Sequence, residues 1–295
     1  MIFTELNTIC VCSVKFVALK NIKMKKRTFS ILLTCLAILI VTVSCRKTTR
    51  DNDKETTSVS DQGLAEFVFN DVYKQVYLSL AGDTNIVVST CDTSYLYPAY
   101  PDSTYPKTLT IRFDTINSCA GADGITRKGT IKAILTGDMG DSLSMATITF
   151  NKYYVNGNKV TGTKYITYKG HNSSGHKYYT VKVYGATITT GEGEISWTSN
   201  RTREWIEGDT TMTTSDDVYL ITGTTSGTSI TGNTFAVITN SPLRVELGCK
   251  YPTSGIITLQ PGGNLVPRKV DFGTGACDAV VAVTIAGKTF DVTLP

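Results

Sequence analysis

The sequence has few of the residues on which most enzyme active sites depend. Its 295 residues include only two histidines, His171 and His176, and both lie in one polar stretch. A Ser-His-Asp or Cys-His catalytic site would have to use that stretch. The phosphate-binding motif G-x-x-x-x-G-K-[ST], the nucleophile elbow G-x-S-x-G and the zinc motif H-E-x-x-H do not occur. We therefore expect no cofactor, and we expect that the protein is not an enzyme.

Carboxylate chemistry stays open as an alternative, because a glycosidase needs only two acidic side chains across a cleft. The available acidic residues include Glu192, Glu194, Glu204, Glu207, Asp216 and Asp217. Acidic residues in turns normally face solvent. A carboxylate hydrolase such as a glycosidase therefore requires two of them to share one cleft, with raised pKa values.

Long apolar runs are also scarce, and the clearest one belongs to an export signal. A cationic start at residues 24–27 precedes the apolar residues 31–41, and Ser44 and Cys45 follow. A membrane-spanning helix needs about 20 apolar residues, so this run is too short to be one. We predict a signal peptide over residues 1–44, with residues 1–23 upstream of the true start at Met24.

The residues before Cys45 resemble a bacterial lipobox, in which the cysteine receives a lipid and becomes the new N-terminus. This resemblance implies lipidation of Cys45, and hence a membrane partner through the lipid anchor. It places the protein in the cell envelope, as an outer-membrane lipoprotein that faces either the periplasm or the cell surface.

The basic character of the chain belongs mostly to this leader. The whole chain has a formal net charge of +4. Residues 1–44 contain six Lys or Arg and one acidic residue, so the remaining 251 residues carry a net charge of −1. A nucleic-acid partner is therefore not expected.

Four cysteines remain after the leader and Cys45 are set aside: Cys91, Cys119, Cys249 and Cys277. An even number in an exported chain indicates two disulfides, and four cysteines allow three connectivities. The separations of 28 residues in 91–119 and in 249–277 are equal. We therefore favour the pairs Cys91–Cys119 and Cys249–Cys277, in weakly duplicated units near 84–135 and 243–294. Coincidence would explain the same spacing.

The chain after Cys45 divides into three parts. Residues 45–62 are polar and predict a flexible stalk. Residues 63–80 have apolar side chains at helical spacing, after a candidate cap at Asp61, and predict one amphipathic helix packed on the domain. Residues 81–295 are predicted to form a single β-rich domain.

Alternating polar and apolar residues dominate this domain, with Thr, Val, Ile and Tyr as the common types. Short turns such as Asn156-Gly157 join the alternating runs, so neighbouring strands should be antiparallel. About fifteen candidate strands exceed the usual single sheet. We predict an all-β fold, an extended antiparallel meander that forms a sandwich or a wide curled sheet or barrel.

Two loops carry candidate ligand-binding residues. Residues 95–106 contain four tyrosines and three prolines, and rigid tyrosines suit a sugar- or peptide-binding surface. The candidates are Tyr95, Tyr97, Tyr100 and Tyr105, although such a loop can also simply cover the sheet. Asp114, Asn117 and Asp123 offer oxygen ligands for calcium, but they lack the EF-hand order, and Asx turns explain the same residues.

Taken together, the chain resembles the uncharacterised β-rich lipoproteins common in Bacteroidota. The resemblance is carried by Ser44-Cys45, residues 106–129, Asn156-Gly157, Asp271-Phe272-Gly273 and Cys277-Asp278. It implies no catalytic role for any residue. The expected function is a membrane-anchored, non-catalytic binding or structural module of the envelope, with a glycan or an envelope protein as partner. A carboxylate hydrolase and a calcium-stabilised adhesin-like module are the alternatives.

Overall fold

The computed structural model describes residues 53–81, 92–114, 119–211 and 213–295. The predicted signal peptide, Cys45, Cys91 and Asn117 lie outside these ranges. Among the described helices, none has the length and apolarity needed to span a membrane.

One antiparallel sheet runs through the described chain, with its strands in sequence order apart from the short β3, which pairs only with β4. Each strand follows its neighbour through a hairpin or a short connection, as the alternating pattern predicts. The strands are β1 (Asp92–Tyr97), β2 (Lys107–Phe113), β3 (Cys119–Ala120), β4 (Thr126–Leu135), β5 (Met145–Val155), β6 (Asn158–His171), β7 (Lys177–Thr189), β8 (Glu194–Glu207), β9 (Val218–Thr228), β10 (Thr234–Glu246), β11 (Ser254–Pro261), β12 (Arg268–Thr274), β13 (Val280–Ile285) and β14 (Lys288–Thr293).

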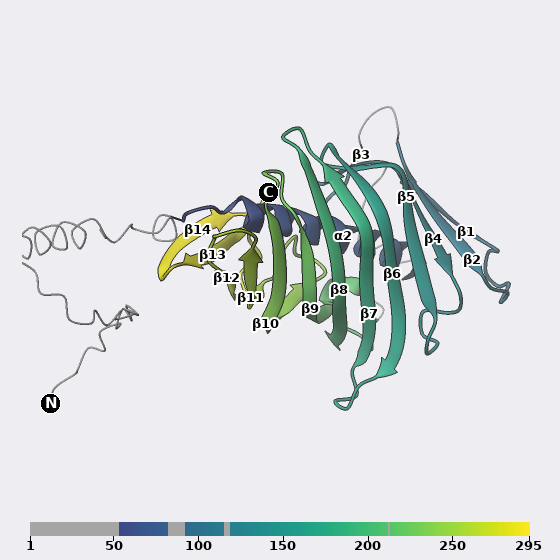
Figure 1. Cartoon of the computed structure of the whole chain (residues 1–295). Coiled ribbons are helices and arrows are strands. Elements are labelled where there is room, and N and C mark those ends of the chain that lie inside the picture. Colours follow the sequence, from purple (N-terminus) through teal and green to yellow (C-terminus); the bar gives the residue numbers. More distant parts are fainter. Residues whose placement is uncertain (1–52, 82–91, 115–118, 212) are drawn as a thin grey trace, which may run out of the picture. The chain divides into compact units, whose positions relative to one another are not determined.

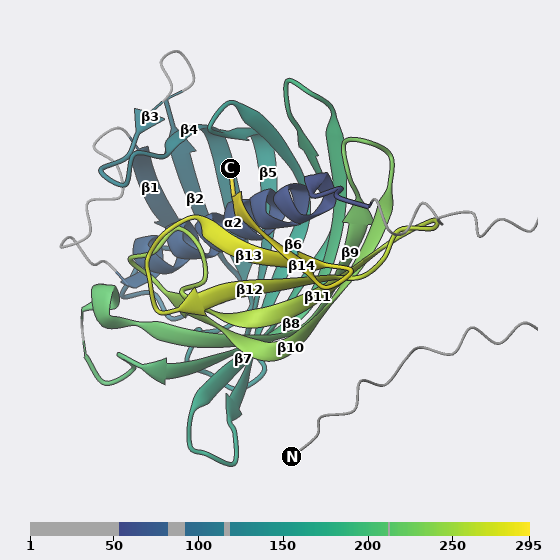
Figure 2. The same cartoon turned by 90° about the vertical axis from the view of Figure 1, so that its left-hand side faces the viewer.

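The predicted meander is confirmed, and its form is a single curled sheet. β1 and β14 are the two edges of the described sheet, so it does not close on itself. A short 3-10 helix, η2 (Thr214–Asp216), lies between β8 and β9. The sheet curls around one long helix, α2 (Thr57–Ala81), which runs through its concave side (Figures 1 and 2).

Helix α2 begins six residues before the predicted Gly63, so residues 57–62 are helical and do not belong to a flexible stalk. The cause is a local cap together with a long-range partner. Glu55 accepts a hydrogen bond from the amide of Ser58 at 2.8 Å, which satisfies one free N–H of the first turn. Arg268 of β12 donates to Asp53 and to the carbonyl of Glu55, which fixes the residues before the helix.

The helix is buried on almost every side, whereas we expected one apolar stripe packed on the sheet. Apolar residues such as Val68 and Val72 are fully buried, and several polar residues are buried with them. These polar residues are Ser58, Asp61, Gln62, Glu66, Asp71 and Gln75. An isolated buried charge costs several kcal/mol. The polar side of α2 therefore needs partners from the sheet.

Two arginines on the inner face of the sheet pair with carboxylates of α2, and a third pairs with a carboxylate just before the helix. Arg201 of β8 lies 2.8 Å from Glu66. The guanidinium of Arg127 on β4 binds both carboxylate oxygens of Asp71, and its Nε lies 2.9 Å from Oδ2. Arg268 lies 2.7 Å from Asp53, just before the helix. Because guanidinium and carboxylate pair through charge-assisted bonds, each arginine fixes one point of the helical segment.

Contacts other than ion pairs complete the interface between helix and sheet. The indole of Trp197 donates to Gln62 at 2.9 Å and stacks on Phe69 with ring centroids 5.2 Å apart. Lys164 of β6 donates to the carbonyl of Phe69 at 2.5 Å, and burial holds the pKa of Lys164 well below its ordinary value. These contacts fix the position of α2 along the inner face of the sheet.

The disulfide Cys249–Cys277 is present, as the spacing predicted, and its cysteines have Cα atoms 5.4 Å apart. It joins the chain just after β10 to the chain just after β12. Cys119 begins β3, but its partner in the predicted pair, Cys91, is outside the described residues.

Replacing Arg127 with Met should lower the free energy of unfolding by about 3 to 5 kcal/mol, because it leaves Asp71 buried without its cation. Chemical denaturation measures this loss. The control is Lys269→Met, which removes an exposed pair with Asp271 at 3.3 Å and should cost less than about 1 kcal/mol. Equal small effects of the two substitutions would contradict a structural role for the buried pair.

Replacing Cys249 and Cys277 together with serine should cost roughly 3 kcal/mol, because the loop between them is no longer closed in the unfolded chain. Under reducing conditions, the midpoint of denaturation of this double variant should match that of the parent protein. A variant as stable as the oxidised parent would show that the crosslink does not stabilise the fold.

Candidate functional site

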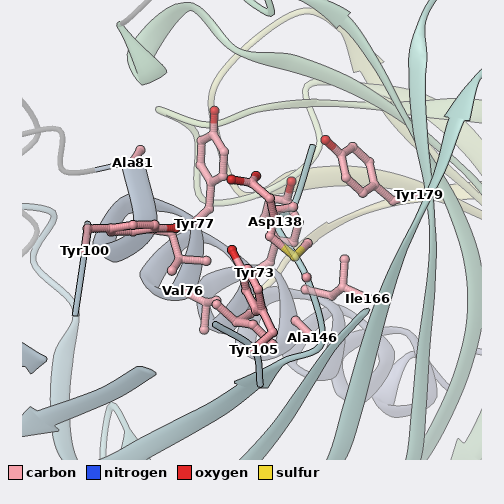
Figure 3. Close-up of a pocket in the computed structure, with 14 residues that line it drawn as sticks. Tyr73, Val76, Tyr77, Ala81, Tyr100, Tyr105, Asp138, Ala146, Ile166 and Tyr179 are labelled. Carbon is pink, nitrogen blue, oxygen red and sulfur yellow. The ribbon is translucent and has the colours of Figure 1, made fainter. Parts of the chain in front are cut away.

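A cavity of about 330 Å³ lies beside the C-terminal half of α2 (Figure 3). The helix forms one wall, the inner faces of β4 to β7 form another, and two loops complete it: the tyrosine loop between β1 and β2, and the loop between β4 and β5. The lining residues are Tyr73, Val76, Tyr77, Leu80, Ala81, Tyr100, Tyr105, Leu135, Gly137, Asp138, Met139, Ala146, Ile166 and Tyr179.

The structure divides the four predicted tyrosines into two pairs. Tyr100 and Tyr105 line the cavity. Tyr95 and Tyr97 do not, and both are exposed, Tyr97 with 75% of its surface accessible. Tyr95 and Tyr97 lie on the edge strand β1, and the ring of Tyr95 lies under the guanidinium of Arg112 at 5.2 Å. Tyr100 and Tyr105 are therefore brought together with other tyrosines, and Tyr95 and Tyr97 are not. Tyr100 is also 59% exposed, so it lies at the solvent side of the cavity.

A buried lysine at the start of β2 supports the tyrosine loop. Lys107 is fully buried, and its ammonium donates to the carbonyls of Pro98, at 3.0 Å, and Asp102. The same ammonium lies over the rings of Tyr100 and Tyr105, at 4.8 and 5.4 Å from their centroids. Because backbone carbonyls and aromatic faces both attract a cation, Lys107 holds the loop and both cavity tyrosines in place.

The hydroxyl pKa is raised at four of the five cavity tyrosines, so these four are neutral near pH 7. Burial, together with the adjacent Tyr100 and the charges of Asp138 and Asp141, raises the pKa of Tyr105 to about 12. Burial also raises the pKa values of Tyr73, Tyr77 and Tyr179. These hydroxyls can therefore donate hydrogen bonds without carrying charge.

Among the described residues of the lining, Asp138 is the only acidic one, and none is a lysine, arginine or histidine. Asp138 is exposed in the loop between β4 and β5, where its carboxylate accepts a hydrogen bond from the amide of Gly140 at 3.0 Å. The described wall of the cavity is thus aliphatic and aromatic, with one acidic side chain.

A second carboxylate, Asp217, is buried behind the cavity next to Tyr77. The residue is 1% exposed, and neither carboxylate oxygen accepts a hydrogen bond of normal geometry from the described residues. Burial raises the pKa of Asp217 to about 6, although the nearby hydroxyls of Tyr77 and Tyr219 oppose this shift. Asp217 is therefore close to the point of protonation in a mildly acidic environment.

The other predicted candidates lie elsewhere in the fold. His171 and His176 flank the hairpin between β6 and β7, and Nδ1 of His176 lies 2.7 Å from Glu204. Asp123 binds Arg127 at 2.8 Å. Asp114 ends the segment before residues 115–118, which are not described. Within the described ranges, no group of three or more His, Cys, Asp and Glu residues could hold a metal ion.

The acidic residues available for hydrolysis do not gather in the cavity. Glu192 and Glu194 are exposed at the turn between β7 and β8. Glu207 pairs with Arg244 at 2.9 Å, and this hydrogen bond lowers its pKa. Asp216 and Asp217 are adjacent, but Asp216 is exposed and its neighbour is buried. None of the six acidic candidates lines the cavity.

The helix and strand tyrosines of the cavity were missed because their sequence signals are those of core residues. Tyr73 and Tyr77 lie on α2 at helical spacing, and Tyr179 lies on the buried face of β7. Only the proline-rich loop was distinctive enough to draw attention. Tyr73 and Tyr77 are one helical turn apart, a spacing that places both on one side of the helix.

Comparisons with known proteins identify no relative: no family model, curated protein or solved structure matches the chain significantly. The function must therefore be argued from the site itself.

Replacing Asp217 with asparagine should stabilise the protein at pH 8 and not at pH 4. The pKa of Asp217 is raised from 3.8 to about 6 on folding, so the folded state binds the proton more tightly and the carboxylate destabilises the fold as pH rises through 4 to 6. At pH 8 the variant should gain up to about 3 kcal/mol. Unfolding free energies of parent and variant with the same pH dependence would refute this assignment.

Proposed function

We propose that this chain is a non-catalytic ligand-binding lipoprotein of the cell envelope, and that the cavity beside α2 is its binding site. The observation that carries the proposal is the convergence of five tyrosines from the helix, a strand and a loop on one cavity. Cavities of about 300–1,000 Å³ with mostly apolar walls and few polar groups are typical of small-molecule sites.

The construction of the walls supports a binding role. Ligands bind best where the site is already formed, because ordering flexible side chains reduces affinity. Tyr73 and Tyr77 are stacked, with ring centroids 5.9 Å apart, and Tyr73 lies under Arg203 at 3.8 Å. Lys107 fixes Tyr100 and Tyr105 from the other side. The aromatic walls are therefore held in place before any ligand arrives.

The position of the cavity along α2 also suits a tethered binding protein. Helix α2 has 25 residues, so its two ends lie roughly 37 Å apart. The proposed anchor, Cys45, precedes Asp53 by eight positions and is connected to the N-terminal end of the helix. The cavity lies at the C-terminal end. Lipidation of Cys45 would thus attach the domain at the opposite end of the helix from the site.

A ligand screen with two matched tyrosine variants tests this proposal. Uncharged small molecules, including mono- and oligosaccharides, aromatic compounds and lipids, are titrated against the mature protein by intrinsic fluorescence and calorimetry. Tyr100→Ala should weaken binding of any hit about tenfold or more, the equivalent of 1.4 kcal/mol. Tyr97→Ala removes an exposed tyrosine at the end of β1, outside the cavity lining, and should leave the affinity unchanged.

A screen without hits, or hits with equal affinity for both variants, would contradict the cavity as the site. Intact mass of the protein purified from membranes tests the anchor separately. A diacyl-modified N-terminus at Cys45 supports the envelope assignment, and an unmodified chain that starts elsewhere contradicts it.

A further inference from the structure

We infer that the ligand of the cavity is an uncharged aliphatic chain, such as the acyl chain of a neutral lipid. This inference rests on the proposed function, because it names the ligand class of the same site. Three properties of the cavity wall support it: its charged side chains, the number of its hydrogen-bonding groups, and the cations that already lie over some of its tyrosine rings.

The charge of the wall disfavours an anionic ligand. The described lining has no cationic side chain, and Asp138 is its only acidic side chain. The cation that lies over the loop tyrosines, Lys107, is already bound by two backbone carbonyls. An anion that enters the cavity would lose its water without gaining a positive partner, which is costly.

Three of the five lining tyrosines already have a cation over one face of the ring, which makes them less attractive to a cationic ligand. The ammonium of Lys107 lies over Tyr100 and Tyr105, and the guanidinium of Arg203 lies over Tyr73. A second cation on these rings would be repelled by the first. These three tyrosines therefore differ from the rings of aromatic cages that bind ammonium groups, in which the ring faces are free.

The hydrogen-bonding groups are too few for a sugar. Seven of the fourteen described lining residues have aliphatic or thioether side chains, and none of the fourteen is an asparagine, glutamine, serine or threonine. The tyrosine hydroxyls and the Asp138 carboxylate are the only polar side-chain groups among them. Each sugar hydroxyl that is buried without a partner weakens binding, and a sugar carries several. A methylene chain needs no such partner and gains affinity with each group that leaves water.

Competition binding of defined ligands to the mature protein, from which non-covalently bound lipids have been removed, tests this inference. The probes are a fluorescent polyene alcohol, its free acid, a monoacylglycerol and a neutral oligosaccharide. The alcohol and the monoacylglycerol should bind, the acid should bind about tenfold more weakly at pH 8, and the oligosaccharide should not compete. Binding of the alcohol without the monoacylglycerol would indicate a free aliphatic chain, and binding of both would indicate that the cavity also accepts the acyl chain of a lipid.

A blocking variant locates the bound chain. Ala81 lines the cavity at the exposed end of α2, and Ala81→Trp should reduce the affinity for the alcohol at least tenfold. The control is Ala236→Trp, at an exposed position on β10, which should bind the alcohol as the parent does. Circular dichroism and unfolding of both variants verify that they are folded.

The outcomes separate the two proposals. Saccharide binding that depends on Tyr100, without binding of the aliphatic probes, would overturn the acyl-chain assignment and leave the cavity as a binding site. Tighter binding of the acid than of the alcohol would also overturn it. Aliphatic binding that is equal in Ala81→Trp and Ala236→Trp would contradict the cavity itself.

Discussion

The fold depends on ion pairs between a buried helix and the sheet that curls around it. Glu66 and Asp71 on α2 meet Arg201 and Arg127 on strands that lie 135 and 56 residues further along the chain. Without these cations, the acidic side of α2 could not leave water, and the open sheet would lack the element that covers its apolar concave face. The pairs also fix the position of the helix along its axis, because each carboxylate has its own arginine.

The cavity follows from this arrangement. The pairs lie in the N-terminal and middle parts of α2, and beyond Asp71 the polar partners give way to tyrosines and aliphatic residues. There aromatic side chains lie between the helix and the sheet. Lys107 and Arg203 stabilise these side chains by lying over the ring faces of Tyr100 and Tyr73. One helix therefore serves as a structural core at one end and as a wall of the candidate site at the other.

The sequence predicted the sheet better than the helix or the site. Strand alternation and short turns are local signals, so the meander followed from them, and the equal cysteine spacing identified Cys249–Cys277. The start of α2 was missed because Ser58, Asp61 and Gln62 are polar, as in a flexible stalk. The burial of Gln62 depends on the distant Trp197 and Thr225, and that of Asp61 on the amide of Ile230, which no local pattern reveals. The loop composition indicated Tyr100 and Tyr105, whereas Tyr73, Tyr77 and Tyr179 have the spacing of core residues.

Hydrogen–deuterium exchange on the mature protein tests the central claim, that α2 is an internal part of the sheet's core. The account predicts that amides of residues 60–76 exchange as slowly as those of β6 to β8, and that Glu66→Gln speeds the exchange of the helix more than that of the strands. Fast exchange of α2 in the parent protein, with the strands still protected, would show that the helix opens independently and would contradict the account.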